Sequence, residues 1–233
     1  MKTKKEKAVQ QKITDHRVWL DEVEIGVLGP IDSGKVTDML ARATRDNPLH
    51  IAAFGEDPEG RLRILQRFFG VAANVLGWQE HMLAARGSDG TIVGVCGMTP
   101  PGGCLPDLGL KLRVVPDPQQ DGTPVAARIA SWLGAWSERD PGRRHWHLGP
   151  LAVETGLQGM GVGSRLMEVS CAQVDASGED AYLETDTRAD LLFYGRFGFE
   201  VIGEQNVLGV PNWFMRRTRR GVSRPSIIDD LQR

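Results

Sequence analysis

The chain has few of the residues that mark specialised classes of small protein. Its 233 residues include only three cysteines, an odd number without paired spacing, so we expect no disulfide framework, no structural zinc and no other metal site. Such sparing use of cysteine is typical of the reducing cytoplasm, where we place the protein. No apolar run reaches the roughly 18 residues of a membrane span, and the lysine-rich start leads into no apolar segment of a signal peptide. A membrane is therefore not an expected partner.

An excess of charge of one sign is missing as well. Lys and Arg number 28 against 30 Asp and Glu, which gives a formal net charge of −2. A dedicated nucleic-acid binder is usually basic, so nucleic acid is not an expected partner either. A hydrophobic content of 41% and a charged content of 25% are those of a globular protein, and they exclude disorder along the whole chain.

Glycine is the residue that the chain has in excess, with 28 among 233 residues, against a usual share of about 7%. The length allows one large domain or two small ones, and we see neither an internal repeat nor a linker that would divide it. Lysines dominate the beginning, and arginines with Gly, Ser and Pro dominate the end. We therefore predict a disordered basic tail over 1–14, one domain over 15–218 and a loose tail over 219–233.

Strand-like and helix-like patterns follow one another along the domain. The predicted strands, in chain order, cover 17–27, 82–85, 92–98, 145–153, 181–185, 199–203 and 213–217. The predicted helices cover a segment from 32 or 33 to near 48, then 60–76, 124–138, 161–176 and 190–197, with a loop rich in Pro and Gly over 99–121. This order predicts an α+β (α/β mixed) domain with a mixed sheet.

A glycine-rich segment between a predicted strand and a predicted helix carries the clearest chemical signal. Gly159, Gly161 and Gly163 allow backbone N–H groups to converge, and the helix that follows adds its unpaired N–H groups and positive dipole end. The segment is therefore suited to a phosphate or pyrophosphate, although a tight turn with close helix packing is the alternative. A nucleoside-triphosphate loop would need a lysine before Ser164. A doubly wound dinucleotide fold would need more chain than the part that follows Glu184.

Three linked segments resemble the GCN5-related N-acetyltransferase (GNAT) family. Gln158-Gly-Met-Gly-Val-Gly163 is similar to the family's pyrophosphate loop, Gln/Arg-x-x-Gly-x-Gly/Ala. Leu151-Ala-Val153 is similar to the strand before that loop. The segment Phe193-Tyr-Gly-Arg-Phe-Gly-Phe199 resembles the family's Phe-Tyr-x-x-x-Gly-Phe. The resemblance is specific over 145–217 and rests on element order alone over 17–144.

The resemblance implies a GNAT-like fold: a central, mixed, mostly antiparallel and twisted sheet of about seven strands, flanked by about four or more helices. It also implies acetyl-CoA as the cofactor, with a slot for pantetheine where one strand splays from the next. Backbone groups of Leu151, Ala152 and Val153 would pair with the pantetheine amides. The pyrophosphate would be held by Gln158, Gly159, Met160, Gly161, Val162, Gly163 and Ser164. Relatives often dimerise, so a homodimer is compatible with the sequence.

The family uses a tyrosine in its Phe-Tyr segment as a general acid, and Tyr194 matches it; packing on a helix face is the alternative. The general base is less certain from the sequence. Glu184 is the leading carboxylate, the other candidates are His145, His147, Glu154 and Asp186, and a reaction without a dedicated base stays open. Asp190 is a departure, because many relatives have Asn there, and a carboxylate cannot donate a hydrogen bond as an amide does.

The layout is similar to that of small-molecule acetyltransferases of the puromycin N-acetyltransferase type, so we expect an N-acetyltransferase acting on a small-molecule amine. Side chains available for an acceptor pocket are His50, Phe54, Trp78, Trp132 and Trp136, although each tryptophan is equally suited to the core. The alternative function is a catalytically inactive acyl-CoA-binding sensor or interaction module. A nucleotide-binding oxidoreductase is a third, weaker hypothesis.

Overall fold

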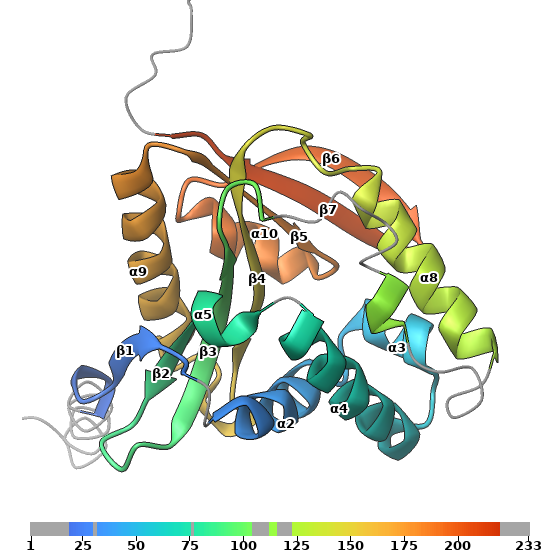
Figure 1. The fold of residues 1–233 in the computed structure, drawn as a ribbon, viewed down its shortest axis with the longest axis horizontal. Coiled ribbons are helices and arrows are strands. Elements are labelled where there is room, and N and C mark those ends of the chain that lie inside the picture. The colour runs from blue at the N-terminus through green and yellow to red at the C-terminus, as the bar shows by residue number, and fades with distance from the viewer. Residues whose placement is uncertain (1–18, 30–31, 76, 104–111, 116–122, 220–233) are drawn as a thin grey trace, which may run out of the picture.

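One twisted sheet of seven strands runs through the residues that a computed structural model describes, which are 19–29, 32–75, 77–103, 112–115 and 123–219 (Figure 1). The strands are β1 (Glu24–Val27), β2 (Met82–Arg86), β3 (Ile92–Thr99), β4 (His145–Val153), β5 (Asp180–Thr185), β6 (Glu200–Val207) and β7 (Val210–Arg217). Their order in the sheet is β1-β2-β3-β4-β5-β7-β6. Every neighbouring pair is antiparallel except β4 with β5. The predicted α+β, GNAT-like sheet is confirmed.

Helices cover both faces of the sheet, and each face has its own hydrophobic core. The helices are α2 (Ser33–Thr44), α3 (Pro48–Phe54), α4 (Pro58–Val75), α5 (Trp78–His81), α8 (Thr123–Ser137), α9 (Val162–Ser177) and α10 (Arg188–Gly195), with short 3-10 turns η2 (Leu112–Val114) and η3 (Thr155–Leu157). Helices α2, α3, α4 and α8 build the core on one face, and α9 and α10 build the core on the other (Figure 1). Strand β2 serves both cores, because Met82 and Ala84 point to the first and Leu83 and Ala85 to the second.

Two predicted elements differ from the structure. The strand expected over 17–27 is confined to Glu24–Val27, because the chain is helical at 19–21. The helix expected to run to Pro48 ends at Thr44, and a second helix, α3, begins at Pro48. The cause is the Asn47–Pro48 step: a residue before proline is driven into the extended region, where Asn47 lies (φ −61°, ψ 139°), and proline favours the first turn of a helix. The predicted tails, apart from Arg219, and most of the predicted loop over 99–121 lie outside the described residues.

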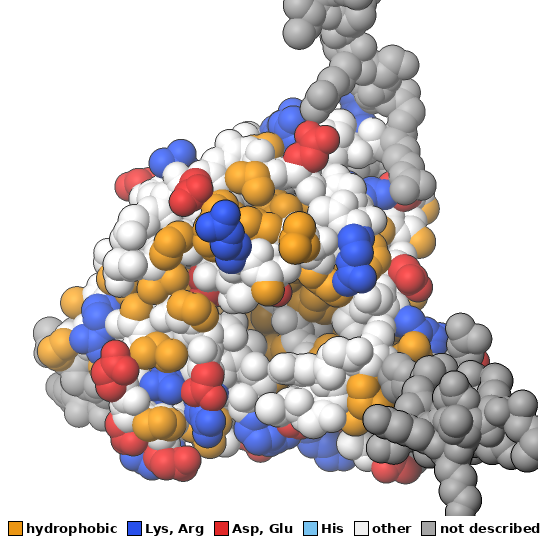
Figure 2. All heavy atoms as spheres, turned by 180° about the vertical axis from the view of Figure 1, so that it is seen from behind, with side chains coloured by type: hydrophobic (Ala, Val, Ile, Leu, Met, Phe, Trp, Pro, Cys, Tyr) orange, Lys and Arg blue, Asp and Glu red, His pale blue; other side chains and the backbone are white. Residues whose placement is uncertain are grey.

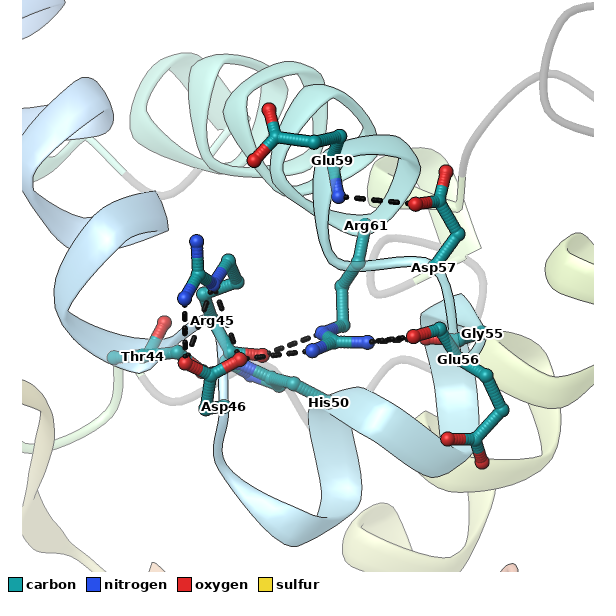
Figure 3. Close-up of polar contacts among 9 residues, drawn as sticks. All are labelled: Thr44, Arg45, Asp46, His50, Gly55, Glu56, Asp57, Glu59 and Arg61. Atoms are coloured by element: carbon teal, nitrogen blue, oxygen red, sulfur yellow. Dashed lines mark hydrogen bonds and ion pairs between the residues drawn. The ribbon is translucent and has the colours of Figure 1, made fainter.

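A buried arginine fixes the connections around α3 (Figure 3). Arg61, only 3% exposed, donates from its guanidinium to the carbonyls of Arg45 (2.7 Å), Gly55 (2.6 Å) and Glu56 (3.2 Å), and to Asp46 Oδ1 (2.8 Å). Hydrogen bonds from Arg45 and Arg61 lower the pKa of the Asp46 carboxyl to about 2. The chain between α2 and α3 is therefore held in place although it has no regular structure of its own.

No helix among the described residues combines the length and the apolar character needed to cross a membrane.

Candidate active site

The two parallel strands at the centre of the sheet separate partway along their length. β4 pairs with β5 only over His145, Trp146 and His147, so β4 from Leu148 to Val153 has no strand partner on its β5 side among the described residues. On its other side β4 keeps its pairing with β3, through a register shift between Cys96 and Met98. Gly97 allows this irregularity, because a Cβ there would collide with the Gly149 carbonyl.

A groove of about 610 Å³ opens at this separation and contains most of the predicted cofactor residues. Leu151, Ala152 and Val153 line it on the strand side. Gln158, Gly159, Gly161, Gly163 and Ser164 line it on the loop side. Met160 and Val162 are not part of its lining, and Val162 is instead buried in the core beneath the loop. The structure thus brings eight of the ten residues predicted for cofactor binding into one groove.

The glycine-rich loop forms an anion cradle at the start of α9. Gly159 (φ +76°) and Gly161 (φ +88°) occupy the left-handed region that L side chains rarely adopt. Gly161 immediately precedes α9, whose first-turn N–H groups have no partner within the helix. The guanidinium of Arg196, 5.1 Å from the centre of the Phe193 ring, also lines the groove. Unpaired N–H groups, the helix dipole and one cation together favour a negatively charged ligand.

A second cavity, of about 270 Å³, adjoins the groove. One wall is formed by aromatic and aliphatic side chains of the helical layer, and the facing wall by polar side chains of β4, β5 and α10. His50, Trp78, Trp132 and Trp136, which the sequence left divided between core and pocket, all line it, whereas Phe54 is buried in the core alone. The cavity and the groove share five residues: Thr44, Asn47, Leu151, Asp190 and Tyr194.

Tyr194 lies where the two spaces meet. It is a buried residue of α10, in ring contact with Phe193 and Phe199. Burial, followed by the nearby Asp190 carboxylate, raises the pKa of the Tyr194 hydroxyl above its ordinary value. The hydroxyl is therefore protonated at neutral pH, as a proton donor must be before it acts.

Of the five candidates for the general base, three face the second cavity: His147, Glu184 and Asp186. His147 Nε2 on β4 and Glu184 Oε2 on β5 are 2.7 Å apart, with the Glu184 side chain 4% exposed and that of His147 21% exposed. Asp186 Oδ2 accepts a hydrogen bond from the backbone N–H of Leu49 at 2.7 Å.

The other two candidates lie outside both spaces. The Nδ1 atom of His145 lies 2.6 Å from the Arg143 carbonyl. Glu154 forms an ion pair with Arg42 at 2.7 Å, which lowers the pKa of the Glu154 carboxyl. Neither side chain contributes to the lining of the groove or the cavity.

Asp190, the departure from the family pattern, lies at the junction with Tyr194. Its Oδ2 accepts a hydrogen bond from the Thr185 hydroxyl at 3.0 Å, and burial raises the pKa of the carboxyl above its ordinary value. Two further junction residues, Thr44 and Asn47, were not predicted. They come from the α2–α3 connection, and only the Asn-Pro step marks that connection in the sequence.

Comparison with known proteins agrees with this geometry. Residues 119–201 match the model of an acetyltransferase (GNAT) domain. A histone acetyltransferase HPA2 and related acetyltransferase from Corynebacterium glutamicum has a similar fold, with a TM-score of 0.62 and 23% identity over 88% of this chain and 99% of that one. A putative acetyltransferase from Salmonella typhimurium, solved with its cofactor acetyl-CoA, gives a TM-score of 0.51 and 14% identity over 88% and 98%. A search of curated protein sequences returned no match.

Fold, groove and domain match define the class of protein as an acyltransferase that uses coenzyme A thioesters. More particularly, the chain carries a GNAT acetyltransferase domain and is an acetyl-CoA-dependent N-acetyltransferase. The resemblance to the GNAT family that the loop and the Phe-Tyr segment predicted is confirmed, and so is acetyl-CoA as the cofactor.

Proposed function

We propose that this chain moves an acetyl group from acetyl-CoA directly to the primary amine of a small molecule, with Tyr194 as the general acid. The observation that carries the proposal is the shared wall of the groove and the cavity. A cofactor in the groove and an acceptor in the cavity meet at Tyr194. Fold relatives that include an agmatine N-acetyltransferase and an arylalkylamine N-acetyltransferase from Aedes aegypti support a small amine as the acceptor.

The groove fits the cofactor in its own geometry. The edge of β4 from Leu151 to Val153 offers backbone groups to an extended, amide-containing arm, and the loop from Gln158 to Ser164 offers N–H groups to a pyrophosphate. Acetyl-CoA, when bound, supplies an acetyl group activated as a thioester. The Tyr194 hydroxyl donates a proton to the departing sulfur. The burial that raises the pKa of the Tyr194 hydroxyl also disfavours a thiolate in the same space, so the proton transfer stays feasible.

Glu184 acts on the acceptor side, together with His147. An amine reaches the cavity mostly as an ammonium ion and must lose a proton before it can attack. With one proton on Nε2 facing Glu184, the imidazole of His147 takes up the ammonium proton at Nδ1, and the Glu184 carboxylate stabilises the charge that develops on the ring. The amine nitrogen then forms its bond to the acetyl carbon as the carbon–sulfur bond breaks.

Replacing Tyr194 with Phe tests the proposal. Tyr194→Phe keeps the buried ring and removes only the hydroxyl, so we expect kcat to fall by roughly 10²–10⁴-fold, the contribution of general acid catalysis. The Kd for acetyl-CoA should stay close to that of the wild type. Release of free thiol from acetyl-CoA, measured against a panel of primary amines, gives kcat, and calorimetry gives Kd.

Two controls decide how the result is interpreted. Glu184→Gln keeps the shape of the acceptor side and should lower the rate while leaving acetyl-CoA binding unchanged. Phe199→Leu alters a ring packed against Tyr194 without touching its hydroxyl, and should leave kcat within a fewfold of wild type. An unchanged kcat in Tyr194→Phe would eliminate the acid role. Tight acetyl-CoA binding without turnover of any amine by the wild type would favour the inactive sensor.

A further inference from the structure

The cavity next to Tyr194 has one sign of charge. Its lining includes the carboxylates of Glu184, Asp186 and Asp190 and no lysine or arginine from the described residues. The surface behind the view of Figure 1 is different, because Lys and Arg side chains lie interspersed with Asp and Glu (Figure 2). The acidic character therefore belongs to the cavity and is not a general property of the exterior.

The three carboxylates come from the end of β5 and the start of α10, so they lie on the polar wall, beside the junction with the groove. Each is held by a neighbour: Glu184 by His147, Asp186 by the N–H of Leu49, and Asp190 by the Thr185 hydroxyl. None has a lysine or arginine partner in these contacts. A cation from outside is the group that would complement this wall.

The opposite wall is apolar and rigid. Its rings contact one another in a continuous cluster, with centroids 5.1 to 6.1 Å apart in the pairs Trp132–Trp136, Phe68–Phe69, Phe68–Trp132 and Phe69–Trp78. Rings in mutual contact cannot move independently, so they form a preformed surface for an apolar or aromatic body. The volume of about 270 Å³ limits that body to a small one.

We propose that the acceptor is a compact hydrophobic primary amine that binds as an ammonium ion and carries no carboxylate. Its ammonium group lies among Glu184, Asp186 and Asp190 beside Tyr194, and its apolar body lies against the ring cluster. This inference rests on the proposed function and adds to it the class of acceptor. An α-carboxylate on the amine would bring a fourth negative charge into a wall that has no cation to receive it.

Three amines with the same phenyl ring separate charge from bulk. The kcat/KM is measured for 2-phenylethylamine, phenylalaninamide and phenylalanine at saturating acetyl-CoA, each corrected for its fraction of free amine. Like charges placed side by side in an interface cost several kcal/mol, so we expect phenylalanine to be at least about 100-fold poorer than 2-phenylethylamine. Phenylalaninamide has nearly the same bulk without the charge and should stay within roughly tenfold of 2-phenylethylamine.

Two variants test the walls separately. Asp186→Asn keeps an oxygen for the N–H of Leu49 and removes one charge, so the ratio of phenylalaninamide to phenylalanine should fall about fivefold or more. Asp38→Asn, which removes a carboxylate on the exposed side of α2, should leave that ratio unchanged. Phe69→Leu should weaken 2-phenylethylamine more than propylamine, because only the first amine reaches the rings.

Binding measurements distinguish this inference from the proposed function. Calorimetry of the three phenyl amines is carried out in the presence of coenzyme A, where no turnover occurs. If no amine is acetylated but 2-phenylethylamine binds and phenylalanine does not, the proposed function fails and the acceptor class stands. If acetylation occurs but is fastest with phenylalanine, with a polar diamine or with a phenylalanyl peptide, the acceptor class is overturned and the proposed function stands.

Discussion

Individual glycines in the loop before α9 have a measurable cost and a measurable purpose. Gly159 and Gly161 hold backbone conformations that other residues adopt only with strain. In return the loop approaches its ligand without any Cβ in the way. At this scale, the purpose can be tested by comparing two glycines of the same helix.

Gly161→Glu should abolish binding of coenzyme A. Gly161 lines the groove at the start of α9, so a glutamate there fills the cradle and repels phosphate. Calorimetric titration with coenzyme A measures the loss, and we expect Kd to rise by at least about 100-fold, as like charges brought together cost several kcal/mol.

Gly178→Glu is the matched control. Gly178 ends the same helix at φ +69° and has open space around its Cβ position, so the variant introduces the same strain and the same charge away from the groove. Its stability should fall by about 1–2 kcal/mol, while its affinity for coenzyme A stays that of the wild type. Equal loss of affinity in the two variants would show that the loop is not the phosphate site.

At the residue scale, the sequence predicted best where a short motif determines the geometry. The glycine loop and Tyr194 were both found, because they are local patterns. The contact between His147 and Glu184 joins side chains 37 positions apart on two strands. Only the register of β4 against β5 brings them together, and no sequence pattern reports that register. The sequence therefore offered both as candidates for the base but could not pair them.

Among the elements, the three helices α2, α3 and α4 depend on one buried side chain. Arg61 on α4 donates to carbonyls in both connections that flank α3. The first connection carries Thr44 and Asn47, which line the junction of groove and cavity. A residue remote from the chemistry thus positions part of the active site.

Arg61→Met should destabilise the protein while keeping most of the apolar stem. Buried carbonyl groups that lose their donor cost about 1–3 kcal/mol each, and partial relaxation leaves an expected loss of about 2–4 kcal/mol. For a chain of this size that corresponds to a fall of roughly 5–15 °C in Tm, which calorimetry or circular dichroism measures.

Arg45→Met is the control for that experiment. Arg45 also binds Asp46, but across an exposed ion pair, and exposed pairs contribute little to stability. Its Tm should change far less than that of Arg61→Met. Similar losses in the two variants would mean that the ion pairs with Asp46, and not the backbone carbonyls, are what Arg61 contributes.

The sequence predicted most elements because their patterns are local, and it missed α3 for a physical reason. Hydrophobic periodicity marks α4, α8 and α9 over four or more turns, whereas α3 has only seven residues and therefore too short a period to recognise. The same limit applies to β1, where four residues were predicted as part of a longer strand. Turn chemistry at 88–90 was sufficient to locate the β2–β3 hairpin.

On the scale of the whole molecule, two cores share one sheet, and the groove lies at the point where that sheet separates. A ligand in the groove contacts β4, the α9 loop and α10 together. Binding should therefore stabilise the fold as a unit and not a single segment.

Coenzyme A at 100 times its Kd should raise the free energy of unfolding by about 2.7 kcal/mol. For a domain of this size, the expected rise in Tm is roughly 5–10 °C, and a thermal-shift titration measures it. Gly161→Glu should show no such rise at the same concentration. A wild-type Tm that does not respond to coenzyme A would contradict binding in the groove.

The separation of β4 from β5 also places an exposed strand edge in the middle of a sheet and not at its border. Among the described residues, the carbonyl of Val153 on that edge accepts only a side-chain hydrogen bond, from Gln158. Unpaired edges attract other strands and promote association between chains. The bound cofactor would close this edge as a missing strand would, so coenzyme A is the additive to include whenever the protein is concentrated or stored.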